Sequence, residues 1–300
     1  MNNKEIKVLP TNISKVEENS VWCPTFQLIW NNLKNDIVKD NIVFDNDKDN
    51  IYANELNKEM FNEAMISDNY YYKNYGYMTL ELKKTIEKDI KNKFNEKSDI
   101  LDQFNFTKQS TDYFLYSILV RNFKFKYPFD ILSENTFGIK DDSDKILDEN
   151  INVLFYENDS YAVKLLTTDN DEVILYKGDI NNNFNDTFKL IIDKSNEENF
   201  NSDDTITISN LNLDIEKKYD ELTNKTFYDN LGKSYVINDA LQTIKFNFDN
   251  TGGKIKSEAG ISVRFACIVH GRHFDFTNNF VLFIKESNKE LPYFALNINN

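Results

Sequence analysis

The chain is poor in the residue types on which many catalytic and metal sites depend. Its 300 residues include only 2 cysteines and 2 histidines, too few for a disulfide framework. The spacing Cys267-x-x-His270-x-x-His273 could bring zinc ligands together, but we interpret it as part of an ordinary exposed loop. The sequence also lacks a glycine-rich loop that would hold phosphate. We therefore predict no bound metal and no cofactor, and we expect that the protein is not an enzyme.

Glycine and proline are scarce as well, with 8 and 4 residues. No linker rich in either residue divides the chain, so we predict a single domain over residues 1–300, with 1–18 as a loose N-terminal segment. The chain is instead rich in aromatic residues, with 24 Phe and 16 Tyr that can supply a large core. Asparagine is also frequent, which indicates a bacterial-like, AT-rich coding bias.

Negative charge predominates, with a formal net charge of -14 at pH 7. An acidic surface repels phosphate groups, so we expect neither nucleic acid nor an anionic membrane as a partner. No apolar run approaches the ~18 residues of a membrane span. Met1–Ser14 lacks the basic start and apolar core of an export signal, which predicts a cytoplasmic protein, or an extracellular one if a signal segment has been removed. The acidic runs Asp45–Asp49 and 141–144 lack the pattern of a calcium loop.

Hydrophobic periodicity predicts helices in the first third of the chain and strands after it. Apolar residues recur at helical spacing within 24–38, and Leu82–Phe94 is suited to a helix that covers a sheet. Residues 52–104 are predicted helical with an interruption at 70–76, and 179–186 as a turn. The predicted strands are 113–125, 151–157, 161–167, 172–177, 187–192, 205–213 and several within 234–296.

The stretch after the glycine pair Gly252-Gly253 alternates between two kinds of side chain. One face of an extended strand would carry Ile255, Ser257, Ala259, Ile261, Val263 and Phe265. The other would carry Lys256, Glu258, Gly260, Ser262 and Arg264. A strand with one apolar or small face is suited to lie on a sheet.

Several motifs stand in a fixed order along the chain. Asn19–Pro24 (NSVWCP) opens a helix, and Tyr113–Asp130 joins an apolar strand to FKFKYPF. Ile208–Leu222 has the pattern of a strand followed by a helix. Phe276–Phe294 (FTNNFVLFIKESNKELPYF) combines a polar turn, an apolar strand, a polar hairpin and Pro-x-Phe. In this order, and in the spacing from Gly253 to the apolar strand, these motifs resemble those of the serpins.

The resemblance to the serpins implies an α+β fold, with a large central, mostly antiparallel sheet, helices packed around it and further smaller sheets. It implies that strand 113–123 lies inside the large sheet and that the C-terminal strands 278–285 and 291–298 pair in a second one. It also implies an interaction protein, an inhibitor whose reactive loop near 254–273 is cut by a serine or cysteine protease. The cut loop would then insert into the sheet as a new strand.

The resemblance also assigns site residues. Gly252 and Gly253 take the place of the hinge from which the loop leaves its strand. The loop residues that it assigns are Lys254, Ile255, Ser257, Ala259, Ile261, Val263, Arg264, Cys267, Ile268 and Arg272. Since Arg264 and Arg272 are the only arginines of the loop, we predict cleavage by a trypsin-like protease at one of them.

Departures from the family leave alternatives open. The polar cluster that latches serpin sheets corresponds to Cys23, Ser117 and Ile244, and all three differ from the family's Ser, Asn and His. A serpin-like scaffold that does not inhibit and binds some other partner is therefore the first alternative. The second is a thiol hydrolase using Cys23 with His270 or His273, although the apolar surroundings of Cys23 predict a buried residue at a helix start.

Overall fold

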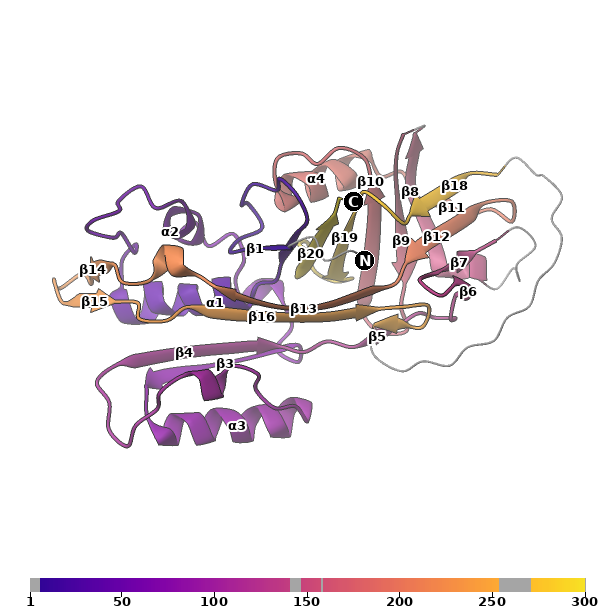
Figure 1. The fold of residues 1–300 in the computed structure, drawn as a ribbon. Helices are drawn as coiled ribbons and strands as arrows, with labels where there is room; N and C mark the ends of the chain where they lie inside the picture. The colour runs from indigo at the N-terminus through magenta and orange to yellow at the C-terminus, as the bar shows by residue number, and fades with distance from the viewer. Residues whose placement is uncertain (1–5, 141–146, 158, 254–270, 300) are drawn as a thin grey trace. The chain divides into compact units, whose positions relative to one another are not determined.

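The computed structural model describes residues 6–140, 147–157, 159–253 and 271–299. The chain forms two compact units. The first unit holds Met1–Trp22, Asn122–Asp214 and Lys245–Asn300, and the second holds Cys23–Arg121 and Ile215–Ile244. Strands β13 (Leu211–Lys218) and β16 (Leu241–Phe248) pair in a two-stranded sheet (Figure 1), and each contains residues of both units. The single domain over 1–300 stays a prediction.

An eight-stranded sheet is the largest layer of the first unit. Its order is β1-β2-β20-β19-β10-β9-β8-β11, and all its pairs are antiparallel except β1 with β2. The predicted α+β fold with a large, mostly antiparallel sheet is therefore confirmed. The strands are β1 (Lys7–Leu9), β2 (Ser20–Trp22), β8 (Ile151–Glu157), β9 (Ser160–Leu166), β10 (Asp171–Lys177), β11 (Glu198–Asn199), β19 (Phe280–Glu286) and β20 (Phe294–Ile298).

Strand β19 is apolar without alternation because both of its faces are covered. All residues of Phe280–Ile284 are buried, as expected for a strand inside a layered core. Helix α4 (Phe184–Lys194) packs on it, with the rings of Phe184 and Phe188 centred 6.0 and 5.4 Å from that of Phe283.

The predicted strand 187–192 is wrong, because these residues lie within α4. The side chain of Asn183 caps this helix by accepting a hydrogen bond from the Asp186 N–H. The buried Phe184, Phe188 and Ile191 follow one another at spacings of four and three residues, which is a helical period. The Asn-rich run 179–186, predicted as a turn, supplies the cap.

A four-stranded sheet in the first unit has the order β18-β12-β7-β6. Strands β12 (Thr205–Ser209) and β18 (His273–Phe276) are parallel, and β7 (Thr136–Ile139) and β6 (Asp130–Ser133) complete the sheet. Phe274 and Phe276 are fully buried. A short pair, β5 (Phe123–Lys124) with β17 (Gly252–Gly253), belongs to the same unit.

The second unit begins with the predicted helix over 24–38. It is observed as α1 (Thr25–Asn32) followed by a π-helical turn over Leu33–Val38. The unit also contains α2 (Ile51–Leu56), the hairpin of β14 (Thr226–Tyr228) and β15 (Ser234–Val236), and three short 3-10 turns.

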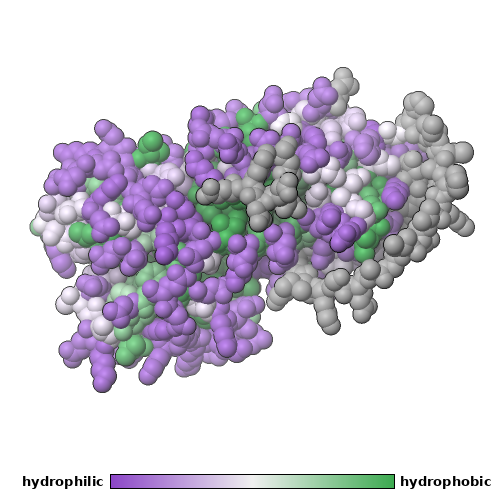
Figure 2. Space-filling model, in the orientation of Figure 1, coloured by the Kyte–Doolittle hydropathy of each residue, from purple (hydrophilic) through white to green (hydrophobic). Residues whose placement is uncertain are grey.

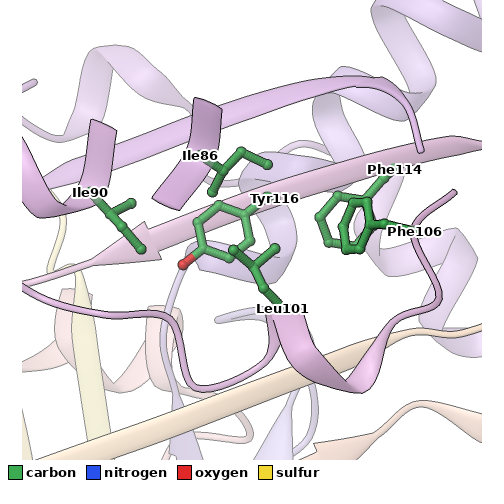
Figure 3. Close-up of a cluster of buried hydrophobic side chains, with 6 residues drawn as sticks. All are labelled: Ile86, Ile90, Leu101, Phe106, Phe114 and Tyr116. Carbon is green, nitrogen blue, oxygen red and sulfur yellow. The ribbon is translucent and has the colours of Figure 1, made fainter. Parts of the chain in front are cut away.

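Helix α3 (Leu80–Phe94) covers the two-stranded sheet of β3 (Tyr71–Tyr77) and β4 (Tyr113–Leu119) (Figure 3). It is capped by Thr79, whose hydroxyl accepts a hydrogen bond from the Leu82 N–H at 3.2 Å. Ile86 and Ile90 point from the helix into a cluster with aromatic residues of β4. The predicted covering helix is thus confirmed. The cluster consists of Ile86, Ile90, Leu101, Phe106, Phe114 and Tyr116.

Two predictions about the sheets are wrong. The strand predicted at 113–123 exists as β4, but among the described residues it pairs only with β3 and lies outside the largest sheet. The predicted C-terminal strands do pair, as β19 with β20, but they belong to the largest sheet. Strand β3 itself lies where an interruption between helices was predicted, because its tyrosines have high strand propensity.

The N-terminal segment is not loose over the residues that the structure describes. Strand β1 pairs with β2, and Leu9 is 1 % exposed. The Val16 N–H donates to the Asn182 carbonyl, and the Asn185 N–H donates to the Asn12 carbonyl, both at 2.9 Å. The prediction of a loose segment was wrong because backbone pairing holds residues 6–18, and their composition does not reveal it.

Hydrophilic residues cover most of the face drawn in Figure 2, in keeping with the many Asn, Asp and Lys of the sequence. None of the helices that the structure describes has both the length and the apolar character needed to span a bilayer.

Candidate functional site

The predicted hinge glycines lie in a tight connection between β16 and the segment that follows. Gly252 and Gly253 pair with Lys124 and Phe123 of β5. Gly252 has φ of +129°, and a Cβ on it would lie 2.4 Å from the carbonyl oxygen of Phe123. Both the backbone angle and the close approach require glycine at this position.

The turn before the hinge is held by Asp249. Its side chain accepts hydrogen bonds from the N–H and the hydroxyl of Thr251, at 2.8 and 2.7 Å. The Thr251 carbonyl in turn accepts from the N–H of Phe125 at 3.1 Å. The N-terminal end of the candidate reactive segment is therefore fixed to the first unit mainly by backbone pairing.

The C-terminal end is fixed by an ionic cluster around Arg272. The guanidinium donates to both carboxylate oxygens of Asp204, with Nη2 2.7 Å from Oδ2. Its Nη1 lies 2.8 Å from Glu198 Oε2, and Nη2 also donates to the Asn199 carbonyl at 2.7 Å. The Asp204 side chain is only 3 % exposed. Hydrogen bonding to Asp204 raises the pKa of Arg272.

His273 begins β18 directly after this cluster. Its Nδ1 lies 2.6 Å from the hydroxyl of Thr205 in the neighbouring strand β12. The two ends of the candidate segment, at Gly253 and Gly271, thus both belong to the first unit. The predicted loop residues from Lys254 to Ile268, together with His270, lie outside the described residues.

The predicted latch positions lie in the second unit, where a polar cluster is built from partly different residues. Ser117 of β4 donates its hydroxyl hydrogen to the Thr25 carbonyl at 2.7 Å. Ile244 is an ordinary buried core residue. The central residue is Gln242 of β16, whose Nε2 donates to the Cys23 carbonyl at 3.1 Å and to the Thr25 hydroxyl at 2.9 Å.

Tyr219 completes this cluster. Its hydroxyl donates to Gln242 Oε1 at 2.7 Å, and its ring lies 4.1 Å from that of Phe26 at the start of α1. Gln242 and Tyr219 are both buried. Sequence reasoning missed Gln242, although it stands two residues before Ile244 and therefore points to the same side of the strand.

The Cys23 thiol is buried and has no features of an activated nucleophile. Burial raises its pKa from 9.0 to about 11, whereas a nucleophilic cysteine has a lowered one. Its carbonyl, not its sulfur, makes the hydrogen bond to Gln242. The geometry therefore gives no support to a hydrolase based on Cys23. In the described part of the chain, no group of three or more His, Cys, Asp or Glu residues is arranged to hold a metal ion.

We expect Cys23 to titrate only in strong alkali. Because its pKa is raised on folding, the thiol stabilises the folded state fully below pH 9, and this contribution is lost as the pH rises through about 11. The two pKa units correspond to roughly 2–3 kcal/mol. The free energy of unfolding, measured by urea titration from pH 7 to 11, should fall by that much less in Cys23→Ser than in the unchanged protein.

Alkylation provides a second readout of the same thiol. In a Cys267→Ser background, iodoacetamide at pH 8 should modify Cys23 at least about a hundredfold more slowly in the folded protein than in urea, because less thiolate is present. Rapid modification of the folded protein would contradict the buried, protonated state.

Neither the protein-family models nor the curated proteins gave a match by sequence. Solved structures do match: Serpin48, a highly specific serpin of the insect Tenebrio molitor, has a TM-score of 0.53 and 10 % identity over 95 % of this chain and 92 % of its own. The chain has the serpin fold.

Two further structures support the serpin fold. Tengpin, a thermophilic serpin in its native state, matches with a TM-score of 0.53 and 13 % identity, over 96 % of this chain and 90 % of its own. Thyroxine-binding globulin in complex with thyroxine matches with a TM-score of 0.52 and 9 % identity, over 94 % and 93 %. The serpin fold therefore occurs in a globulin described as thyroxine-binding as well as in a protein described as a highly specific serpin. The fold alone does not decide between inhibition and binding.

Proposed function

We propose that the chain is a serpin-type inhibitor of a serine or cysteine protease, with residues 254–270 as the segment presented to the protease. The observation that carries this proposal is that both flanks of the segment are fixed to the same unit. Gly252 and Gly253 are paired with β5, and Arg272 is held by Asp204 and Glu198. Fixed flanks hold the two ends of the segment in place, which lowers the entropic cost of presenting it to a protease.

The alternation of apolar and polar side chains after Gly253 supports the second step of the proposed inhibition, in which the cut segment inserts into a sheet. Once the chain is cut, a strand with Ile255, Ala259 and Ile261 on one face could pair with a sheet and bury that face. The protease would be carried along as an acyl-enzyme, in which its Oγ or Sγ has replaced the leaving amine on the scissile carbonyl carbon.

A non-inhibitory scaffold is the second candidate, and the Gln242 cluster favours it. Hydrogen bonds tie both β4 and β16 to the turn that opens α1. Because Gln242 and its bond to the Cys23 carbonyl are buried, separating β16 from that turn is costly. A protein that keeps this arrangement permanently would bind a partner without inserting its loop.

Covalent trapping distinguishes the two candidates. The protein is incubated with trypsin, subtilisin and papain at equimolar ratio, and the mixtures are resolved by denaturing electrophoresis. An inhibitor should give a denaturation-resistant complex with at least one serine or cysteine protease, and the same protease with its nucleophile replaced should give none. Cleavage within 254–270 by all three proteases without any such complex would favour the scaffold.

A further inference from the structure

Arg272 is one of two arginines in the candidate loop, but its side chain is fully engaged by the protein itself. All three guanidinium nitrogens donate hydrogen bonds, to the Asp204 carboxylate, Glu198 Oε2 and the Asn199 carbonyl. The side chain is 19 % exposed. A bidentate arginine–carboxylate pair with a buried acid is among the stronger polar contacts in proteins.

The backbone around Arg272 is fixed as firmly as its side chain. Its N–H donates to Asp204 Oδ1 at 2.9 Å, and its carbonyl accepts from the Thr205 N–H at 2.9 Å. Gly271 lies so close to the turn before β12 that a Cβ on it would be 1.5 Å from the Asp203 carbonyl oxygen. On the other side, His273 and Phe274 continue as a strand paired with β12.

A trypsin-class protease has two requirements at the bond that it cuts. The arginine side chain must leave its own protein and enter a pocket, and the carbonyl must turn toward the oxyanion hole. At Arg272 the first requires breaking the contacts with Asp204 and Glu198, and the second requires losing the hydrogen bond from Thr205. The Arg272–His273 bond therefore becomes a substrate only after local unfolding.

We propose that the clamp formed by Arg272, Asp204 and Glu198 is a specificity determinant, which withholds the Arg272–His273 bond from trypsin-class proteases and confines their action to bonds before Gly271. The proposal deepens the proposed function, since it names where on the loop such a protease acts. The contacts of the clamp are all between described residues, and the clamp would protect the Arg272–His273 bond whether or not the protein inhibits a protease.

Limited digestion with trypsin, followed by intact mass measurement, tests the clamp. The fragment to be followed is His273–Asn300, released by a cut after Arg272. The folded protein should give this fragment about tenfold more slowly than the Asp204→Asn variant, since that change removes a charged hydrogen-bond acceptor and weakens the local structure. Glu149→Gln, which removes an exposed ion-pair partner of Lys126 in the same unit, should leave the rate unchanged.

A second variant, Arg272→Lys, tests the clamp independently in case Asp204→Asn does not fold. Arg272→Lys keeps a residue that trypsin recognises and keeps the positive charge, but a lysine cannot form the bidentate fork. Its melting temperature should stay close to that of the unchanged protein, while a cut after position 272 appears about tenfold faster. Subtilisin, which needs no basic residue, should cut both forms equally before Gly271.

Two results would contradict the proposal that the clamp withholds the Arg272–His273 bond from trypsin-class proteases. The first is a cut after Arg272 in the folded, unchanged protein that precedes or equals cuts before Gly271. The second is an Arg272→Lys variant that folds normally and resists trypsin at that bond as well as the unchanged protein does. Neither result depends on complex formation, so failure of the clamp and failure of the proposed inhibition are separately visible.

Discussion

A single cut between Val263 and residue 270 should raise the melting temperature of the protein by tens of degrees. The freed segment would add a strand and bury Ile255, Ala259, Ile261 and Val263. At ~25 cal/mol per Å2 and ~100 Å2 for each larger side chain, this burial stabilises the cut protein by about 5–10 kcal/mol before entropy. In a chain of this size, such a gain corresponds to a shift of roughly 10–30 °C. Calorimetry before and after limited proteolysis measures it.

A charge on the buried face should abolish this gain. Ala259→Glu would place an unpaired carboxylate among apolar side chains, at a cost of several kcal/mol, while leaving the cut itself unaffected. Ser262→Glu is the matched control, because position 262 belongs to the opposite face of the strand and the gain should persist. If the unchanged protein melts at the same temperature before and after the cut, the segment does not insert, and the non-inhibitory scaffold is the better description.

Gln242→Ala should lower the free energy of unfolding by about 2–4 kcal/mol. The substitution leaves the buried Tyr219 hydroxyl without its acceptor and the Thr25 hydroxyl without a donor, and each lost partner costs ~1–3 kcal/mol. Chemical denaturation followed by tryptophan fluorescence measures the change.

Gln103→Ala is the matched control for Gln242→Ala in the same unit. Gln103 donates to Glu216 on the exposed surface at 2.8 Å, so its loss should change stability by less than about 0.5 kcal/mol. An equal loss of unfolding free energy in the two variants would show that the Gln242 cluster stabilises the fold no more than an exposed hydrogen bond does.

The sequence predicted those helices and strands whose apolar residues pack against elements close to them in the chain. Helix α3 has one apolar stripe and an N-terminal cap, so its period is visible without knowledge of the rest. Strands β8, β9 and β10 follow one another through short turns, and their predicted bounds agree with the structure to within one residue. The paired C-terminal strands were also predicted, because β19 carries a long apolar run.

Features that depend on distant parts of the chain were not predictable in the same way. Which sheet β4 joins is decided by its partner strand β3, which the sequence predicted only as an interruption between helices. The resemblance to the serpins placed Ile244 in the polar cluster with Cys23 and Ser117, whereas the structure has Gln242 at its centre. Asp204 was missed as well, since an acidic residue in the run Ser202–Asp204 gives no sign that it binds Arg272.

The pairing of β2 with β20 has a consequence for how the chain folds during synthesis. Val21 lies opposite Leu296, and Trp22 lies opposite Ala295, so β2 lacks this neighbour until almost the whole chain has been made. Until then, β2 can pair with β1 but not with β20, although Val21 and Trp22 are fully buried in the folded protein. Such long-range closure is slow and leaves apolar surface open to misassociation. The nascent first unit should therefore depend on chaperones far more than the α3–β3–β4 segment, whose two strands pair with each other within Tyr71–Leu119.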